Sequence, residues 1–381
     1  MEFVFWNFLK YFQINFCNLV NNNPYFFYSF LKASYQKYIL DFKRPSGTSR
    51  GILQTKETFF IQIYENEKKG IGECGLLRGL SIDDRPDFEE KLKWSCENIN
   101  LGLDKLYDAL TEFPSIQFGL ETAFRSFTSE NKFDVFPSSF SEGNKGIAIN
   151  GLVWMGDSAF MQQQISEKIA QGFTCIKMKI GAIDFQKEIG LLKNIRKQFS
   201  ASEIELRVDA NGAFSASEAM EKLKILSEYD LHSIEQPIKQ GQLKDMARLC
   251  EKTPLPIALD EELIGVFTEE EKNRLLETIK PQYIILKPSL IGGFRGSDSW
   301  IAIAEKNDVD WWITSALESN VGLNAISQYT FTKCVTLPQG LGTGGLYTNN
   351  LDSPLEIHQG KIWYDSNKIW DLSNLNEIFT E

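Results

Sequence analysis

The chain has 381 residues, more than one hydrophobic core usually supports, so we expect a large domain with a smaller partner domain. With 40 Lys and Arg against 51 Asp and Glu, its formal net charge is −11, which argues against nucleic acid or an anionic membrane as a partner and favours a small molecule. The six cysteines include no C-x-x-C pair, which disfavours a disulfide framework or a zinc site and is typical of a reducing cytoplasm.

The first thirty residues form a segment of unusual composition, rich in Phe, Tyr and Asn and almost without charge. Its longest apolar stretch is broken by Asn7, Lys10 and Asn15, so it falls short of the roughly 20 apolar residues of a membrane-spanning helix. A signal peptide is also disfavoured, because no basic region precedes the stretch and no small-residue cleavage site follows it. We expect residues 1–30 to be an N-terminal extension, either a mis-assigned start or family-specific, or a contact with a membrane surface or partner.

Residues 31–137 are expected to form a small α+β domain. Residues 32–77 contain β-forming runs with partial alternation, separated by turn residues, which predicts an antiparallel meander. From Ser81 to about Phe127, apolar residues recur at spacings of three and four, which predicts helices.

Residues 138–350 change to short apolar strands that alternate with amphipathic helices. The expected strands are 146–154, 175–180, 204–209, 233–237, 256–261, 283–289, 310–316 and 334–340. Apolar strands alternating with helices indicate a parallel sheet, and eight such units favour a closed β/α barrel over the alternative of an open doubly wound sheet. Residues 351–381 are expected to add a hairpin and to return to the first domain.

Charged residues stand at or near the C-terminal ends of these apolar strands, one β/α unit apart. They are Lys177, Lys179, Asp209, Glu235, Asp260 and Lys287. In a parallel barrel these strand ends meet at one mouth, so the side chains are expected to converge there. A single charged residue at a strand end is commonly part of a surface salt bridge. Surface salt bridges alone would not place six charged residues at matching positions of successive strands.

Asp209, Glu235 and Asp260 would present only oxygen ligands, which suit a hard divalent cation, Mg²⁺ or alternatively Mn²⁺. The chain has only two histidines, His232 at the start of a strand and His358 in the tail, so lysine must supply the acid–base chemistry. Three carboxylates around a metal with flanking lysines are suited to removing a proton next to a carboxylate, because the cation stabilises the charge that develops.

Several motifs are similar to those of the muconate-cycloisomerase branch of the enolase superfamily, over about residues 32–365. They are Lys177-Met178-Lys179, Asp209-Ala210-Asn211-Gly212, Glu235-Gln236-Pro237, Asp260-Glu261 and Lys287-Pro288. Within that branch, Lys287-Pro288-Ser289 with Gly292-Gly293, the segment Ser315 to Ser319, and a Gly-rich stretch from Gly340 to Gly345 in place of a D-x-D motif resemble the o-succinylbenzoate synthases.

The resemblance implies an α/β fold, a modified TIM-type (β/α)7β barrel with an α+β capping domain. It also implies Mg²⁺ ligands at Asp209, Glu235 and Asp260. Lys179 would be the base, Lys177 would support the enolate and Lys287 would stabilise the intermediate from the opposite face. A Lys base with Mg²⁺ is the superfamily's established chemistry. The implied reaction, in menaquinone synthesis, is dehydration of 2-succinyl-6-hydroxy-2,4-cyclohexadiene-1-carboxylate to 2-succinylbenzoate.

Six further residues are weaker candidates for binding the substrate: Arg50, Asn211, Glu261, Ser315, Glu318 and Ser319. Asn211 and Glu261 follow metal-ligand candidates but could equally serve a turn or a helix N-cap. Glu318 could instead stabilise a helix N-terminus, and Arg50 could be a solvated turn arginine.

Three other functions remain open on the same scaffold. They are an N-acylamino acid racemase or dipeptide epimerase, a muconate cycloisomerase, and a non-catalytic homologue. The missing D-x-D motif disfavours the dipeptide version, and the complete set of lysines and carboxylates disfavours the last. Fold alone does not decide the substrate, and the sequence leaves the oligomeric state open.

Overall fold

The computed structural model describes residues 30–48, 51–371 and 373. The chain separates into a unit that ends at Leu31 and a second compact unit, Lys32–Glu381, to which everything below refers. All but one residue of the expected N-terminal extension lie outside the described residues. Within the described ranges, no helix is long and apolar enough to cross a membrane.

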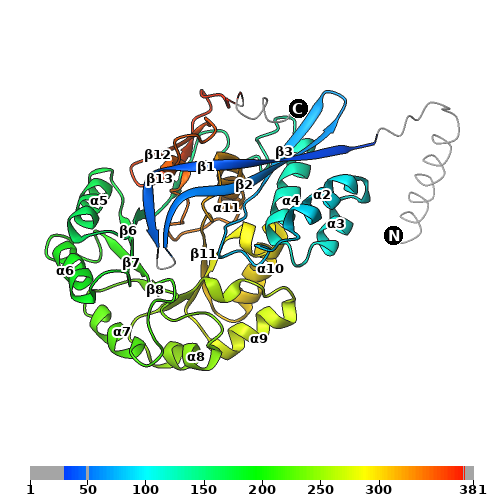
Figure 1. Ribbon diagram of the computed structural model, residues 1–381. Coiled ribbons are helices and arrows are strands. Elements are labelled where there is room, and N and C mark those ends of the chain that lie inside the picture. Colours follow the sequence, from blue (N-terminus) through cyan, green and yellow to red (C-terminus); the bar gives the residue numbers. More distant parts are fainter. Residues whose placement is uncertain (1–29, 49–50, 372, 374–381) are drawn as a thin grey trace, which may run out of the picture. The chain divides into compact units, whose positions relative to one another are not determined.

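The expected meander forms a three-stranded antiparallel sheet in the order β1 (Lys32–Thr48), β2 (Gly51–Glu65) and β3 (Lys68–Cys74). Three helices and a short 3-10 turn follow: α2 (Phe88–Glu97), η1 (Ile99–Leu101), α3 (Leu103–Ala109) and α4 (Pro114–Thr128). Helix α4 packs closely against β3 where Gly72 meets Gly119. A Cβ atom built at Gly72 would lie only 2.0 Å from the Gly119 carbonyl oxygen, so the absence of a side chain at Gly72 allows this approach. These elements are the capping sheet and its helices (Figure 1).

Seven parallel strands then form one sheet whose neighbours follow the chain order. They are β5 (Gly151–Val153), β6 (Cys175–Lys179), β7 (Glu205–Asp209), β8 (Ser233–Glu235), β9 (Ile257–Leu259), β10 (Tyr283–Leu286) and β11 (Asp310–Ile313). The helices between and after them are α5 (Ser158–Ala170), α6 (Phe185–Arg196), α7 (Ala219–Ser227), α8 (Leu243–Lys252), α9 (Glu269–Ile279), α10 (Gly293–Lys306) and α11 (Asn320–Thr332). Figure 1 shows helices α5 to α9 around the outside of the curled sheet, so the predicted β/α barrel with a capping domain is confirmed.

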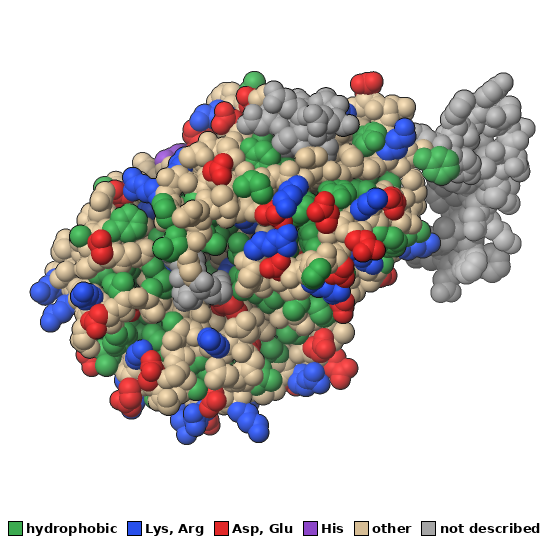
Figure 2. All heavy atoms as spheres, viewed as in Figure 1, with side chains coloured by type: hydrophobic (Ala, Val, Ile, Leu, Met, Phe, Trp, Pro, Cys, Tyr) green, Lys and Arg blue, Asp and Glu red, His purple; other side chains and the backbone are tan. Residues whose placement is uncertain are grey.

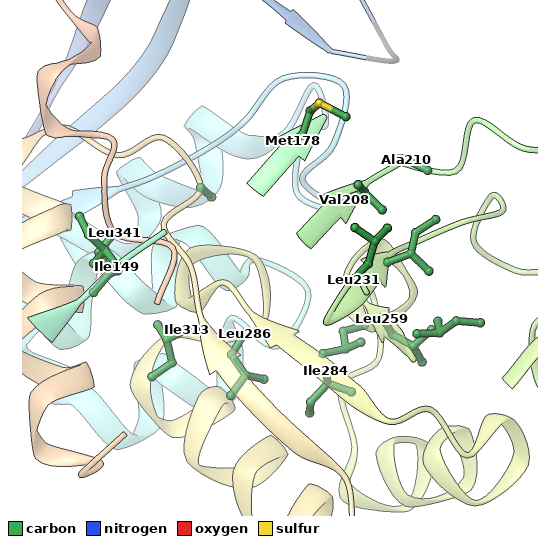
Figure 3. Packing of buried hydrophobic residues seen from close by; sticks show 14 of the residues in the cluster. Ile149, Met178, Val208, Ala210, Leu231, Leu259, Ile284, Leu286, Ile313 and Leu341 are labelled. Atoms are coloured by element: carbon green, nitrogen blue, oxygen red, sulfur yellow. The ribbon is translucent and has the colours of Figure 1, made fainter. Parts of the chain in front are cut away.

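Alternation along the strands decides which side chains face the helices. Met178, Val208, Leu259 and Leu286 belong to one buried apolar cluster with residues of the outer helices (Figure 3). Because successive strand residues point to opposite faces, the neighbours of these apolar residues in the chain must point into the barrel. Those neighbours include the charged residues singled out above.

The prediction of an eighth strand at residues 334–340 is wrong. Only Gln339 and Gly340 pair in parallel, as isolated bridges to Ile149 and Thr314 respectively. Pro338 has no N–H group to offer a ladder, which limits pairing here. Its carbonyl instead accepts a hydrogen bond from Arg207 Nη1 at 2.9 Å. Two residues therefore join the β11 side of the sheet to the β5 side.

The predicted strand 146–154 is divided into β5 and a separate β4 (Ile147–Ala148). β4 pairs with the C-terminal hairpin of β12 (Leu355–His358) and β13 (Lys361–Tyr364). Before the hairpin, the Asn349 side chain accepts from Asp41 N at 2.8 Å and donates to Ile39 O at 2.8 Å. The C-terminal segment thus contacts both the start of the barrel and the edge of β1.

Acidic and basic side chains are interspersed over the face of the molecule in Figure 2. On that face, no basic stripe of the kind that binds nucleic acid is visible. Buried charges, by contrast, are concentrated in the barrel mouth and at the contact between the capping sheet and the barrel.

Candidate active site

The structure brings the six predicted strand-end charges together. Lys179 of β6 stands next to Asp209 of β7, and Asp209 stands next to Glu235 of β8 in the parallel register. Asp260 directly follows β9 and Lys287 directly follows β10. Each of the lysine side chains is no more than 12% exposed and each carboxylate side chain no more than 2%.

Each lysine is paired with a carboxylate. Lys179 Nζ lies 2.9 Å from Asp209 Oδ2, and Lys177 Nζ lies 3.0 Å from the same oxygen. Lys177 also pairs with Glu235, and Lys287 pairs with Asp260 and lies 3.9 Å from Glu235 Oε1. Asp209 and Glu235 are thus shared between lysines.

The pKa values of these groups follow from burial and mutual charge. Burial and the neighbouring Asp209 raise the pKa of Glu235 to about 8. Burial favours the neutral acid at Asp209, but Lys177 and Lys179 outweigh it and lower the pKa of this carboxyl. Burial disfavours the Lys177 ammonium, but Asp209 and Glu235 outweigh it and raise the pKa of Lys177. Burial and the adjacent carboxylates therefore outweigh the two lysines at Glu235 and favour its protonated form.

The three carboxylates suit a divalent cation by their chemistry. Their oxygens are the ligands that Mg²⁺ prefers, and Glu235 Oε1 is buried without a hydrogen-bond partner. In the part of the chain that the structure describes, no three His, Cys, Asp or Glu side chains converge closely enough to hold a metal by themselves. Lysine ammonium groups lie between these carboxylates, so a cation and the lysines would compete for the same oxygens.

Asn211 and Glu261 lie beside the charged cluster. Asn211 Oδ1 accepts from Lys179 Nζ at 2.7 Å, and Asn211 Nδ2 donates to Glu261 Oε1 at 3.1 Å. The backbone N–H of Asn211 donates to Asp209 Oδ1 at 3.0 Å. Asn211 therefore orients both the predicted base and a predicted metal ligand.

A cavity of about 230 Å³ opens over the cluster and is lined by residues of both the barrel and the capping sheet. The lysines, Asp209, Asn211 and Ser315 line it, and Ser315 Oγ lies 2.6 Å from Thr343 Oγ1. Further lining residues are Ile52, Leu53, Leu77, Arg78, Leu80, Asn150, Leu152, Trp154, Thr314 and Leu317. The wall is therefore mostly apolar around a charged floor.

Three of the weaker candidates, Glu261, Glu318 and Ser319, do not line the cavity. Glu318 and Ser319 are fully buried, are absent from the cavity lining and bond to protein groups. Arg50 lies outside the described residues.

Arg78 is a charged lining residue that the sequence alone did not indicate. It lies in the loop after β3, where Nη1 donates to Asp84 Oδ1 at 2.6 Å and Nη2 pairs with Glu57. Its side chain is 48% exposed. The only local indication of a binding role for Arg78 is its place beside Gly79 in a leucine-rich turn. Nothing in the neighbouring sequence indicates that this turn reaches the mouth of the barrel.

Comparison with known proteins agrees with this arrangement. Residues 161–366 match the family described as enolase C-terminal domain-like. The chain is 46% identical to the o-succinylbenzoate synthase of Desulfotalea psychrophila over 87% of this chain and 98% of the relative. The crystal structure of MenC from the same species superposes with a TM-score of 0.78 at 42% identity, over 87% of this chain and 99% of that one.

A more distant structure shares the fold. The dipeptide epimerase of Enterococcus faecalis, in complex with Mg and a dipeptide, superposes with a TM-score of 0.76 at 17% identity over 88% of this chain and 96% of that one. The family match and the near full-length relative lead to one conclusion. The chain belongs to the enolase superfamily, in the muconate-cycloisomerase branch that also contains the o-succinylbenzoate synthases.

Proposed function

We propose that this chain is an o-succinylbenzoate synthase, which dehydrates 2-succinyl-6-hydroxy-2,4-cyclohexadiene-1-carboxylate to 2-succinylbenzoate in menaquinone biosynthesis. The observation that carries the proposal is the 46% identity to a named o-succinylbenzoate synthase over 98% of its length. The convergence of Lys179 and Lys287 on one cavity, from strands on opposite sides of the carboxylate cluster, supports the proton chemistry that this reaction requires. A cytoplasmic location is proposed with it.

Lys179 is the proposed base. In its neutral form Nζ takes the proton from the carbon that carries the substrate carboxylate, and the electron pair moves into that carboxylate as an enolate. The C–O bond to the ring hydroxyl then breaks, and the departing hydroxide takes the proton back from Lys179 to leave as water. Because both groups leave from one face, one lysine can serve as base and then as acid.

Lys177 and Lys287 stabilise charge on the intermediate. Lys177 stands near Lys179 on the same strand, where it would contact the substrate carboxylate, while Lys287 approaches from the end of β10 on the other side of the mouth. The hydroxyl of Ser315 and the amide of Asn211 offer further polar contacts at the cavity wall. Aromatisation of the ring favours departure of the hydroxide.

Asp209, Glu235 and Asp260 are the proposed ligands of Mg²⁺, for which Mn²⁺ could substitute. When bound, the ion would supply positive charge to the developing enolate. Support comes from the all-oxygen donor set, from Glu235 Oε1, which is buried without a hydrogen bond, and from the Mg in the related epimerase structure.

Arg78 is the proposed partner of the succinyl carboxylate. A guanidinium is suited to paired hydrogen bonds with a carboxylate, and Arg78 lines the cavity from the capping side, away from the charged floor. Glu57 and Asp84 already orient its two terminal nitrogens.

The test is loss of the substrate's diene absorbance, followed with Mg²⁺ and with EDTA. We expect turnover that EDTA abolishes and that Lys179→Ala lowers by at least about 10³-fold. Lys193→Ala, at an exposed position on α6, should behave as the unmodified chain. If the unmodified chain with Mg²⁺ leaves the diene untouched, the assignment is wrong.

A racemase or epimerase remains the second candidate, because the same two lysines lie on opposite sides of the cavity. Deuterium exchange at the α-carbon of N-succinylamino acids and dipeptides would reveal it. Exchange without diene turnover would favour this alternative.

A further inference from the structure

A buried polar network lies where the capping sheet meets the ends of β10 and β11. The Glu318 network, as we call it, consists of Lys56, Thr58, Glu73, Ser289, Glu318 and Ser319. Each of these residues is at most 3% exposed, and none lines the cavity. The network is therefore inaccessible to substrate, although its members adjoin residues that do line the cavity.

Glu318 connects the ends of two barrel strands. Its Oε1 accepts a hydrogen bond from Ser289 Oγ, and its Oε2 accepts from the Ala316 N–H at 2.7 Å. Ser289 lies two residues after Lys287, in the 3-10 turn η3 (Pro288–Leu290). Ala316 lines the cavity between Ser315 and Leu317. One carboxylate thus joins the turn behind Lys287 to the adjoining cavity wall, which follows the neighbouring strand β11.

The wall segment held by Glu318 has a restrained backbone. Leu317 has a φ of +66°, a region that a side chain with a Cβ rarely adopts. Tyr347 Oη donates to the Leu317 carbonyl at 2.7 Å, so this residue is held on both sides. Such a conformation persists only when its surroundings fix it.

The capping sheet completes the network. Glu73 of β3 accepts from Thr58 Oγ1 at 2.8 Å, from Ser319 N at 2.9 Å and from Gly322 N at 2.9 Å, and Lys56 Nζ lies 4.0 Å away. A Cβ atom at Gly75 would stand 2.9 Å from Glu318 Cγ, so the chain that leads to Arg78 passes directly against Glu318.

We propose that Glu318 is a positioning residue: by fixing Ser289 it fixes the adjoining Lys287 ammonium group relative to Lys179 across the cavity. The inference rests on the proposed function, in which Lys287 stabilises the intermediate. Glu318 itself cannot reach substrate, because it is buried and both its oxygens already accept hydrogen bonds.

The test is a double-mutant cycle with Lys287→Ala. Displacing a catalytic group by about 1 Å can cost roughly 100-fold in rate, so we expect Glu318→Ala to lower kcat by about 100-fold and Ser289→Ala by about tenfold, with KM changed less than about threefold. In the Lys287→Ala background, either change should lower kcat by less than about twofold, because the group it positions is gone.

Conservative replacement gives a second readout. The amide of Glu318→Gln can accept from Ala316 N and donate to Ser289 Oγ, so most of kcat should return. Ser297→Ala is the matched control. It removes a buried hydroxyl that donates a hydrogen bond to Gly293 O at 2.7 Å but does not line the cavity, so kcat should be unchanged.

The outcomes separate this inference from the proposed function. Equal fold-losses in both backgrounds, or an unchanged kcat in folded Ser289→Ala, overturn the positioning role. If Glu318→Ala does not fold, Ser289→Ala and Glu318→Gln still decide the matter. No turnover by the unmodified chain overturns the proposed function itself.

Discussion

Buried carboxylates in this protein differ in how their charge is compensated. Asp209 faces two lysines, whereas Glu121 of α4 accepts mainly from backbone groups, with Phe294 N at 2.6 Å. Burial outweighs these hydrogen bonds and the charge of Arg295, and raises the pKa of Glu121 to about 7. Glu121 therefore titrates well above the usual range of a glutamate, at a position that does not line the cavity.

Glu121 should make stability depend on pH. Between about pH 4.5 and 7 the folded chain holds a proton there that the unfolded chain releases, so the free energy of unfolding falls as pH rises. Urea unfolding from pH 5 to 7.5 should show the unmodified chain losing on the order of 2 kcal/mol more than Glu121→Gln. Glu112→Gln, at a position 66% exposed, should follow the unmodified chain. Parallel curves for all three would contradict this origin.

Arg78 should act on substrate binding more than on chemistry. Replacing it by Gln removes a charged hydrogen bond worth about 1.5–3 kcal/mol, so kcat/KM should fall about 10- to 100-fold, chiefly through KM. The matched control is Arg85→Gln, since Arg85 also pairs with two carboxylates but does not line the cavity. An equal effect of both variants would assign the loss to surface charge.

The packing of β3 on α4 depends on two glycines that allow the backbones to approach. A methyl group at Gly72 would meet the Gly119 carbonyl, so Gly72→Ala should destabilise the fold by about 1–3 kcal/mol or more in thermal or urea unfolding. In Gly190→Ala, on α6 with open space around it, stability should instead rise by about 0.5–1 kcal/mol. Similar losses in both variants would show that close approach of the backbones at Gly72 does not set the effect.

Helices and strands with a strong local sequence pattern could be predicted from the sequence. Strands whose pairing depends on residues far away in the chain could not. The strands that carry Lys179, Asp209 and Glu235 are apolar runs flanked by helices, so their position and direction followed from pattern alone. The eighth strand failed, since its pairing depends on Pro338 and on Arg207, a residue far away in the chain. The same limit applies to the predicted strand 146–154, which the C-terminal hairpin divides by pairing with β4.

Metal binding should be measurable on the whole molecule without an activity assay. A ligand at about 100 times its dissociation constant adds about 2.7 kcal/mol, so Mg²⁺ should raise the Tm by roughly 2–5 °C and EDTA should reverse the rise. Glu235→Gln should abolish the shift, whereas Glu167→Gln, exposed on α5, should keep it. Titration with Mn²⁺ followed by electron paramagnetic resonance gives a second readout, and binding unaffected by Glu235→Gln would place the metal elsewhere.

At the same scale, the candidate site was predictable on its barrel side only. Parallel strand order brings Lys179, Asp209 and Glu235 together without any knowledge of the cap. Arg78 was not singled out, and Glu318 was a candidate for either the substrate or a helix N-terminus, because contacts such as that of Glu73 with Ser319 join residues 246 positions apart. Periodicity contains no information about such pairs.

The contact between Asn349 and β1 has a consequence for the order in which the protein can assemble during synthesis. Tyr347 forms a β-bridge with Phe42, and Thr348 N donates to Asp41 O at 2.9 Å, so part of the outer edge of β1, from Ile39 to Phe42, is covered by residues about 300 positions later in the chain. An emerging chain would therefore carry an uncovered strand edge until almost all of it had left the ribosome. Such edges invite pairing with other chains, so the nascent protein is most vulnerable to aggregation before residue 349 appears.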